Sequence, residues 1–352
     1  MKAWVLHEIG DFRLEEVEEP ELAKEEVLVA VKAAGICGSD IPRVYRTGTY
    51  SYPTIPGHEF SGKVVGLGAK ADPKWLGKRV GIFPLIPCQN CIPCQNREFE
   101  MCRHYSYLGS RRDGGFAEFV AVPQWNLIEL PDQVSYEQAA MLEPMAVAVH
   151  AARRAMGSFD QSARVAVCGL GAIGLLLTMF LKEAGFSNLL VVGNKAFQRE
   201  MTFRMGLSEE CFCDSRNVDP LKWISERTNG RGTDLFFECV GRNETIAMAV
   251  DAAAPGGTVQ FVGNPASDIT FEKNSYWKIL RNQLTVKGCW NSSFTHEEKD
   301  DWHYVLHKLE AGSIRPENYI TQKFALEELV QGLEMMRDKT REYIKVMMQV
   351  TD

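Results

Sequence analysis

Short apolar runs separated by turn-forming residues fill the first 130 positions of the chain. Each run has the length of a single strand and is bounded by Gly, Pro or Asp: KAWVL (2–6), EVLVAVKAAG (26–35), GKVVGLG (62–68), RVGIFPL (79–85) and FAEFVAVP (116–123). Glycines punctuate the first half of this region, as tight turns require. The pattern predicts a compact, barrel-like β domain.

From Arg164 onward, apolar runs typical of buried strands alternate with helical segments. The predicted strands are RVAVC (164–168), NLLVVG (188–193), DLFFECV (234–240), TVQFVG (258–263) and LTVKGC (284–289). Helical patterns such as 174–185 and 243–257 separate them. This order is typical of βαβ units in a parallel, doubly wound sheet, so we predict an α/β fold.

A helical pattern also connects the two regions. It opens at Ser135, with Gln138 three residues later in the arrangement of a capping box. We expect this helix to run through Glu143 toward Ala155, and we expect Pro144 to kink or divide it.

The end of the chain returns to mixed structure. Helical patterns cover 297–311 and 326–336, and YIKVMMQV (343–350) reads as a last strand. We expect that strand to pair with a sheet of the first domain. The chain shows no internal repeat and no low-complexity segment.

Composition narrows the class of protein. The chain has 352 residues, 45 % of them apolar and 24 % charged, as in a soluble globular protein with room for two domains. A net charge of -7 and a pI near 5.7 argue against a nucleic-acid-binding protein. No apolar run approaches the ~20 residues that cross a bilayer, and the N-terminus lacks the apolar core of a signal peptide. We therefore expect a cytoplasmic protein with no membrane partner.

Ten cysteines in such a protein suggest metal ligands and buried thiols rather than disulfides. Four of them are closely spaced in PCQNCIPCQNREFEMC: Cys88, Cys91, Cys94 and Cys102. Four thiolates at this spacing suit tetrahedral Zn²⁺ with no open position, which predicts a structural zinc site. The alternative is a set of free or disulfide-bonded thiols. Five others lie among apolar residues and are interpreted as packing: Cys168, Cys211, Cys213, Cys239 and Cys289.

A structural zinc site in which protein ligands fill all four positions suggests that a second metal site, with an open position, lies elsewhere in the chain. Cys37 and His58 can supply a thiolate and an imidazole, and a catalytic zinc needs a third protein ligand beside one exchangeable position. We predict Glu143 as the third ligand, with Glu59 as a carboxylate that exchanges at the metal or lies behind it. Each of these residues alone is more often structural, but together they favour a metal site.

Two neighbours of these ligands have predicted supporting roles. Asp40 fits an orienting partner of His58, bound to the ring nitrogen that does not bind the metal. Ser39 lies two residues after Cys37, where its hydroxyl is placed to receive a proton from the substrate.

A glycine pattern predicts a dinucleotide site. GLGAIG follows the strand RVAVC and opens a helix, so its glycines let the backbone approach a pyrophosphate at the helix N-terminus. The residues assigned to this turn are Gly169, Gly171, Ala172, Ile173 and Gly174. A glycine-rich turn without a ligand is the alternative.

The end of the second strand bears on the choice of dinucleotide. NAD sites usually place Asp or Glu about 20 residues after the glycines, but here the strand ends in Gly193, Asn194 and Lys195. A carboxylate there would repel a 2′-phosphate. Gly193 leaves space, Asn194 can donate a hydrogen bond, and Lys195 or Arg199 can supply positive charge. The sequence therefore favours NADP(H) over NAD(H); the alternative is that both cations are solvated surface residues.

Taken together, CGSD, GHEFSG, the four-cysteine segment and GLGAIG resemble the zinc-dependent medium-chain dehydrogenase/reductase family, over essentially the whole chain. The resemblance implies a GroES-like catalytic domain built from 1–150 and 291–352, with a Rossmann-type domain at 151–290 between them and the active site in the cleft. It also implies two zinc ions per chain, held by the two ligand sets named above. Assembly through the nucleotide domain is implied as a homodimer, or a tetramer.

Within the family, the sequence most resembles the polyol and polyol-phosphate branch. The stretches that carry this narrower resemblance are CGSDIPRVYRTGTYSYPTIPGHEFSG, PLIPCQNCIPC, YLGSRRDGGFAEF and KILRNQLTVKGCW. Four arginines lie in them, and arginine binds phosphate bidentately. We therefore predict that Arg43, Arg46 and Arg112, with Arg111 nearby, contact a phosphorylated substrate.

Two positions depart from the branch. Many relatives read CGSD-x-His and use that histidine to relay protons, whereas this chain has Pro42 there. Proton exit must then pass through Ser39, a ribose hydroxyl of the cofactor or water. Polyol-phosphate relatives also tend to keep an Asp where this chain has Gly193, which weakens the transfer of NAD specificity.

The predicted reaction is reversible hydride transfer between a secondary alcohol and the nicotinamide, with zinc as Lewis acid. The substrate alternatives are an unphosphorylated polyol such as sorbitol, an amino alcohol such as threonine, or a keto-sugar phosphate reduced by NADPH. A non-catalytic cofactor-binding relative is a different class, against which the set Cys37, His58 and Glu143 argues. A zinc-free quinone reductase conflicts with all seven proposed ligands.

Overall fold

The computed structural model describes residues 1–157, 159–265 and 267–350. The chain forms two compact units: Met1–Pro144 with Ser293–Asp352, and Met145–Ser292. None of the helices in these described ranges combines the length and apolar character needed to cross a bilayer.

The first unit is mainly β-structure. Its strands are β1 (Lys2–Glu8), β2 (Asp11–Glu16), β3 (Glu26–Ile36), β4 (Glu59–Leu67), β5 (Arg79–Ile82), β6 (Leu85–Ile86), β7 (Ser106–Tyr107), β8 (Phe119–Pro123), β9 (Leu127–Glu129), β16 (Ile320–Ala325) and β17 (Lys345–Gln349). Its α-helices are α1 (Asp40–Pro42), α2 (Ile92–Gln95), α3 (Tyr136–Ala140), α10 (Asp301–Glu310) and α11 (Leu329–Asp338). Short helical turns complete it: η1 (Arg43–Thr47), η2 (Pro73–Trp75), η3 (Phe99–Met101), η4 (Gln124–Asn126), η6 (Pro316–Tyr319) and η7 (Leu326–Glu328).

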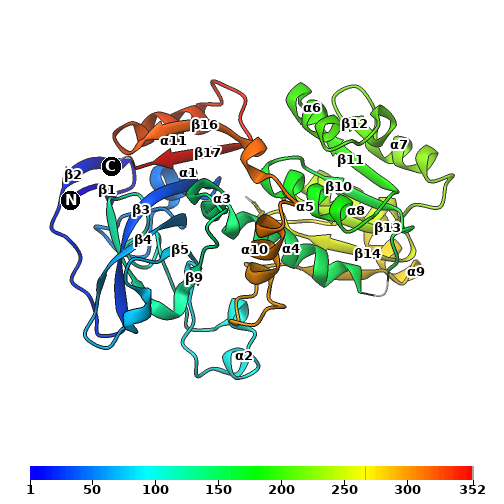
Figure 1. Cartoon of the computed structure of the whole chain (residues 1–352). Helices are drawn as coiled ribbons and strands as arrows, with labels where there is room; N and C mark the ends of the chain where they lie inside the picture. The colour runs from blue at the N-terminus through cyan, green and yellow to red at the C-terminus, as the bar shows by residue number, and fades with distance from the viewer. Residues whose placement is uncertain (158, 266, 351–352) are drawn as a thin grey trace. The chain divides into compact units, whose positions relative to one another are not determined.

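A seven-stranded sheet joins the two ends of the chain in this unit. Its order is β16-β17-β3-β4-β5-β9, with β8 also paired to β3. Figure 1 shows β17, in red, beside β3, in blue, and the two run antiparallel with Val346 opposite Ile36. The last strand therefore joins the sheet of the first domain, as the sequence predicted. Alternating apolar residues of these strands form the core with α11, including Val29, Val31 and Leu333.

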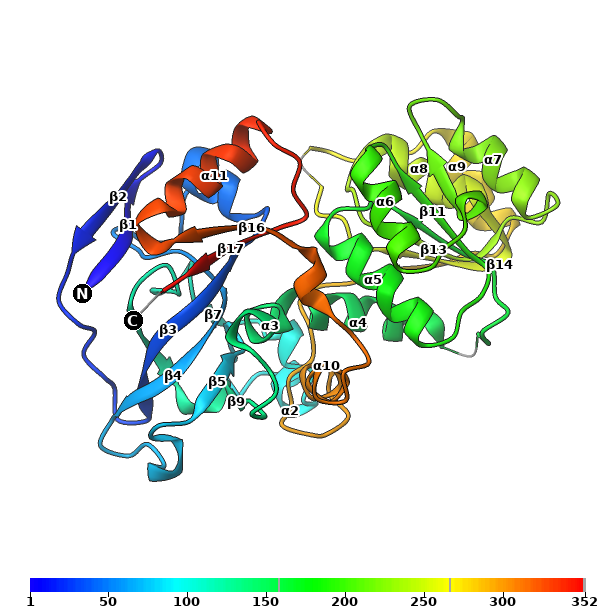
Figure 2. The ribbon, with the colours of Figure 1, turned by 45° about the horizontal axis from the view of Figure 1, so that its top comes forward.

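The second unit is a parallel sheet covered on both faces. Its elements are β10 (Val165–Cys168), α5 (Ala172–Glu183), β11 (Leu189–Gly193), α6 (Ala196–Arg204), η5 (Glu209–Cys211), β12 (Phe212–Asp214), α7 (Pro220–Arg227), β13 (Thr233–Glu238), α8 (Asn243–Ala252), β14 (Ala253–Phe261), α9 (Lys273–Arg281) and β15 (Thr285–Gly288). The strand order is β12-β11-β10-β13-β14-β15, and every neighbouring pair is parallel. In Figure 2, α5 and α6 cover one face and α7, α8 and α9 cover the other. Strands buried on both faces explain the continuous apolar runs of the sequence.

Two helices differ from the sequence prediction. The capping box at Ser135 forms, but its helix α3 ends at Ala140 and α4 (Leu142–Met156) starts afresh. Pro144 lies in the first turn of α4, where its missing N–H costs nothing, so the division falls before the proline rather than at it. The helix predicted over 243–257 ends at Ala252. Pro255 has no N–H to continue the helical hydrogen bonds, and Gly256, at φ +75°, is outside the right-handed helical region.

Candidate active site and dinucleotide pocket

The four clustered cysteines converge on one point. Their sulfur atoms all lie within 4.8 Å of one another, and the pairs Cys88–Cys94, Cys91–Cys94 and Cys91–Cys102 are 4.0, 3.5 and 3.8 Å apart. Sulfurs bound tetrahedrally at 2.3 Å from a zinc ion would be about 3.8 Å apart. Backbone N–H groups of Arg103 and Cys94 lower the pKa of Cys91, which favours the thiolate that binds metal. The donor set and its spacing fit one Zn²⁺.

A second cluster forms where the end of β3 lies beside the start of β4. Cys37 directly follows β3, and His58 and Glu59 lie at the start of β4; Gly35 is opposite Glu59 in the strand pairing. One donor atom from each of Cys37, His58 and Glu59 lies within 4.8 Å of the others. His58 and Glu59 are almost fully buried, whereas Cys37 is partly exposed. Sulfur, imidazole and carboxylate in an accessible cluster fit a zinc site with an open position.

The predicted third ligand, Glu143, lies close to this cluster without belonging to it. Its carboxylate accepts a hydrogen bond from the Tyr107 hydroxyl at 3.4 Å, and the Tyr107 ring packs 5.8 Å from that of His58. Burial and the charge of Glu59 raise the pKa of Glu143 to about 7. In the described residues, the group within metal-binding distance contains Glu59 and not Glu143. The structure thus brings two carboxylates to one site.

Asp40 occupies the position predicted for it. It is fully buried in α1, and its carboxylate lies 3.3 Å from Nδ1 of His58. It also accepts the N–H of Cys37 at 2.9 Å and a guanidinium N–H of Arg43 at 2.6 Å. Burial would raise the pKa of Asp40, but His58 and Arg43 outweigh it and hold the pKa at about 2. Ser39, just before α1, is exposed beside these groups.

A buried lysine enters the same site from the other end of the chain. Lys345 in β17 forms an ion pair with Glu59, and both side chains are almost fully buried. Burial would lower the pKa of Lys345, but the charge of Glu59 raises it above the usual value. Space for the pair exists only because position 35 is glycine: a Cβ there would lie 2.3 Å from Glu59 and 2.7 Å from Lys345.

The four arginines near the predicted substrate site fall into two groups. Arg43 is paired with Asp40, and Arg112 is paired with Glu26 at 2.6 Å, so both guanidinium groups are already neutralised. Within the described ranges, Arg46 and Arg111 show no carboxylate partner. Arg46 is exposed on η1.

Arg111 contacts two aromatic rings. Its guanidinium carbon lies 3.9 Å from the ring centre of Tyr50 and 4.6 Å from that of Tyr105. Tyr105 in turn contacts Tyr107, with ring centres 6.2 Å apart, and Tyr107 contacts His58. These contacts are with aromatic rings and not with a carboxylate, so the N–H groups of Arg111 can bind an anion.

The second unit carries a pocket of about 720 Å³ at the carboxyl ends of its strands. Gly169, at φ +93°, turns the chain out of β10 and into α5. A Cβ on Gly174 would lie 1.9 Å from the carbonyl oxygen of Gly169, whereas one on Gly171 would meet nothing within 4 Å. Gly174 thus permits the tight turn, and Gly171 leaves bare backbone facing open space. This cradle fits a pyrophosphate.

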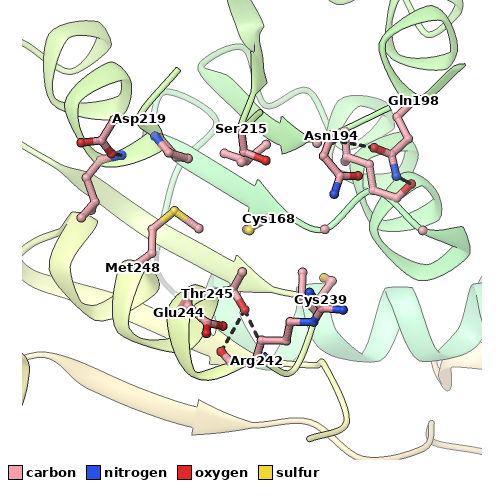
Figure 3. A pocket seen from close by; sticks show the side chains of 18 residues that line it. Cys168, Asn194, Gln198, Ser215, Asp219, Cys239, Arg242, Glu244, Thr245 and Met248 are labelled. Atoms are coloured by element: carbon pink, nitrogen blue, oxygen red, sulfur yellow. Dashed lines mark hydrogen bonds between the residues drawn. The ribbon is translucent and has the colours of Figure 1, made fainter. Parts of the chain in front are cut away.

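Figure 3 shows how polar groups frame the pocket. Asn194 and Ser215 lie on one side, and Arg242 and Thr245 lie on the opposite side. The loop that carries Arg242 is fixed by Glu238, a fully buried carboxylate that accepts N–H groups of Val240 and Gly241 and the hydroxyl of Thr245 at 2.7 to 3.1 Å.

The predicted cofactor residues are not all in this pocket. Gly169, Gly171, Gly193 and Asn194 line it; Ala172 and Ile173 begin α5, and Gly174 lies beneath the turn. Lys195 and Arg199 line a neighbouring groove together with Arg216, and Arg199 is paired with Glu209. Gln198 closes the turn, because its oxygen accepts the N–H groups of Asn194 and Lys195 and its amide donates to the Leu170 carbonyl.

Sequence reasoning missed several residues that the fold brings to these sites. They are Tyr107, Gln198, Ser215, Glu238, Arg242, Thr245 and Lys345. None belongs to a recognisable metal or nucleotide motif. Tyr107, Glu238 and Lys345 do lie in stretches quoted above: YLGSRRDGGFAEF, DLFFECV and YIKVMMQV.

Comparison with known proteins agrees with both units. Residues 23–132 match the alcohol dehydrogenase GroES-like domain, and residues 172–311 match the zinc-binding dehydrogenase domain. The L-threonine 3-dehydrogenase of Bacillus subtilis (strain 168) is 32 % identical over 329 residues, which cover 92 % of this chain and 91 % of that enzyme. The chain belongs to the zinc-dependent medium-chain dehydrogenase/reductase family. The predicted family, the fold class and the assignment as an enzyme are confirmed.

Other relatives of this medium-chain dehydrogenase act on different alcohols. The galactitol 1-phosphate 5-dehydrogenase of Escherichia coli (strain K12) is 29 % identical over 334 residues, 95 % of each chain. A crystal structure of galactitol-1-phosphate dehydrogenase from Escherichia coli superposes with a TM-score of 0.91 at 29 % identity, covering 99 % and 100 % of the two chains. A zinc-binding dehydrogenase from Sinorhizobium meliloti 1021, bound to NADP, superposes at 0.89 with 27 % identity, covering 99 % and 98 %. The chain is thus a zinc-dependent alcohol or polyol dehydrogenase.

Proposed function

We propose that the protein transfers a hydride between a secondary alcohol of a polyol phosphate, or the matching keto-sugar phosphate, and NADP(H). The cluster of Cys37, His58 and a buried carboxylate, on a chain that also has a dinucleotide pocket, is the observation that carries this proposal. The similarity to galactitol 1-phosphate 5-dehydrogenase supports the substrate class. A reaction of this kind needs an electrophile, a hydride carrier and a path for one proton.

We assign two zinc ions per chain. Cys88, Cys91, Cys94 and Cys102 hold the structural ion, and Cys37 and His58 hold the catalytic one. We keep Glu143 as its third ligand, as the sequence predicts, although Glu59 is the carboxylate that lies within ligand distance of Cys37 and His58. A bound zinc lowers the pKa of the substrate hydroxyl and stabilises alkoxide charge.

The residues around the open site position the ligands and remove the proton. Asp40 fixes the orientation of His58 through Nδ1, which leaves Nε2 to face the metal. Ser39 is exposed next to Cys37, where its hydroxyl receives the substrate proton and passes it to solvent. Pro42 has no side-chain group that could relay a proton, so we assign the relay to Ser39.

Substrate phosphate is assigned to Arg111, with Arg46 as a second cation. Arg43 and Arg112 carried the same prediction, but their ion pairs with Asp40 and Glu26 make them weaker candidates. An arginine that contacts aromatic rings, with no carboxylate partner among the described residues, can present to phosphate the fork of N–H groups that it needs.

Replacing Arg111 by Ala should therefore discriminate between phosphorylated and unphosphorylated polyols. We expect the Michaelis constant for galactitol 1-phosphate to rise roughly 10- to 100-fold, because a charge-assisted hydrogen bond contributes about 1.5 to 3 kcal/mol. The constant for galactitol should stay within about twofold. Arg315→Ala, at an exposed arginine with no predicted contact to substrate, is the matched control for loss of one surface charge. Equal effects of Arg111→Ala on both substrates would favour an unphosphorylated polyol or an amino alcohol instead.

Preference for NADP(H) is supported by the end of β11. Gly193 has no side chain to repel a 2′-phosphate, Asn194 and Ser215 line the pocket, and Lys195 and Arg216 line the adjoining groove.

Replacing Asn194 by Asp should add the missing negative charge. We expect kcat/KM for NADPH to fall about 10-fold or more while that for NADH changes less than threefold. A native enzyme that prefers NADH would contradict the assignment.

A homodimer is proposed through β15, the edge strand of the parallel sheet. An open edge next to exposed apolar side chains is a common pairing surface. The exposed apolar residues are Tyr276, Trp277, Leu280, Val286 and Trp290, each more than 40 % accessible.

Val286→Asp should yield monomers at micromolar concentration in light scattering, whereas Val218→Asp, at an exposed site elsewhere in the unit, should not. Dimers of the Val286 variant would exclude this edge.

A further inference from the structure

Arg43 is a largely buried arginine beside the open cluster, and its ion pair makes it a weak candidate for binding substrate phosphate. It directly follows α1, and its guanidinium donates to Oδ1 of Asp40, three residues earlier, at 2.6 Å. Residues three apart lie on the same face of a helical turn, so the local backbone brings the two side chains together. The side chain of Arg43 is only 17 % exposed, and that of Asp40 is fully buried.

Asp40 connects two of the residues assigned to the catalytic zinc. Its Oδ2 accepts the backbone N–H of Cys37 at 2.9 Å, and its Oδ1 lies 3.3 Å from Nδ1 of His58. The guanidinium of Arg43 meets that same Oδ1, and its Nη1 also lies 3.4 Å from Nδ1 of His58. One carboxylate therefore contacts both ligands, and Arg43 contacts the carboxylate and one of the ligands.

This arrangement depends on a cation beside the carboxylate. A fully buried carboxylate is costly unless it is paired and hydrogen-bonded. Arg43 supplies a charge that does not vary with pH, because a guanidinium keeps its proton in proteins. Without it, the carboxylate of Asp40 gains by turning toward water, and both Cys37 and His58 then lose the group that orients them.

We propose that Arg43 is a positioning residue for the catalytic metal, which fixes Asp40 and thereby holds His58 and the backbone of Cys37 in the orientation that binds zinc. This inference rests on the proposed zinc site. It assigns Arg43 to the metal ligands and not to the substrate phosphate, and the two roles predict different effects of the same substitution.

Arg43→Met removes the charge and the hydrogen bonds while keeping an unbranched side chain. Loss of a group that supports a metal ligand commonly costs about 10- to 100-fold in metal affinity or activity. We expect the zinc of the open site to bind weaker by about that factor, as measured by competition with a chelator. We expect kcat to fall to a similar extent with galactitol 1-phosphate and with galactitol, and the ratio of their Michaelis constants to stay native.

Three further variants make the result specific to Asp40. Arg43→Lys keeps the positive charge and should retain most of the zinc affinity. Arg13→Met is the matched control, because Arg13 also pairs with an aspartate, Asp11, but on the exposed face of β2, and it should match the native protein. In Asp40→Asn, the added change Arg43→Met should alter zinc affinity less than about twofold, because Arg43 acts through Asp40.

Two measurements show whether each variant is folded. The zinc ion of the four-cysteine site should be retained, and the affinity for NADPH should stay native, because its pocket lies in the other unit. If Arg43→Met does not fold, Arg43→Lys and the double variant with Asp40→Asn carry the test.

Three outcomes would overturn the role of Arg43. They are native zinc affinity in Arg43→Met, a rise in the Michaelis constant confined to galactitol 1-phosphate, and an effect of Arg43→Met that is as large in Asp40→Asn as in the native protein. Native protein that holds one zinc per chain would instead overturn the proposed function.

Discussion

Replacing Cys37 by Ala should lower kcat/KM about a thousandfold and reduce the zinc content from two ions per chain to one. Cys37 supplies the thiolate of the open cluster, and without it His58 and one carboxylate cannot hold Zn²⁺ tightly. A metal that stabilises alkoxide charge contributes several kcal/mol to the barrier, and about 4 kcal/mol corresponds to a factor of roughly a thousand. Steady-state kinetics and elemental analysis of the same preparation measure both effects.

Two controls make this result specific. Cys211→Ala removes a partly exposed thiol from the second unit and should keep both zinc ions and full activity. The thermal transition of Cys37→Ala should stay close to that of the native protein, because the four-cysteine site is intact. Normal activity in Cys37→Ala with a single zinc would contradict the assignment of the catalytic metal.

Alanine at Gly171 and at Gly174 should impair cofactor binding for two different reasons. A Cβ at position 171 has open space, so Gly171→Ala should fold normally while its methyl group obstructs the pyrophosphate and raises the cofactor Kd about 10-fold or more. A Cβ at position 174 collides with the Gly169 carbonyl, so Gly174→Ala should also lower the free energy of unfolding by about 1–3 kcal/mol.

Fluorescence titration with NADPH and chemical denaturation measure the two variants side by side. The distinction depends on a loss of affinity without a loss of stability in Gly171→Ala. If that variant binds NADPH as tightly as the native protein does, the dinucleotide is not bound against this turn.

Much of the fold was predictable because its signals are local. Period-two and continuous apolar runs marked β3, β4, β10 and β13, and the capping box at Ser135 formed as expected. The errors concern helix ends. Pro144 is tolerated in a first turn, and the helix ends at Ala252 shortly before Pro255 and Gly256. Both outcomes follow from local residue chemistry that the apolar pattern alone does not register.

The candidate site was predictable where its residues are neighbours in the sequence. The four cysteines and GLGAIG each lie within one short segment, so spacing alone indicated their geometry. The partners of charged residues were not predictable in this way. Arg112 faces Glu26, and Lys345 reaches Glu59 from the far end of the chain, because strand pairing rather than sequence distance sets these contacts.

The central claim is an accessible zinc ion bound by sulfur, imidazole and carboxylate. Crystals grown with zinc and NADPH, measured at the zinc absorption edge, test it most directly. The account predicts two anomalous peaks per chain, one among the four cysteines and one bound to Cys37, His58 and Glu143. A single peak at the cysteines, with Cys37 and His58 pointing away from each other, would contradict it.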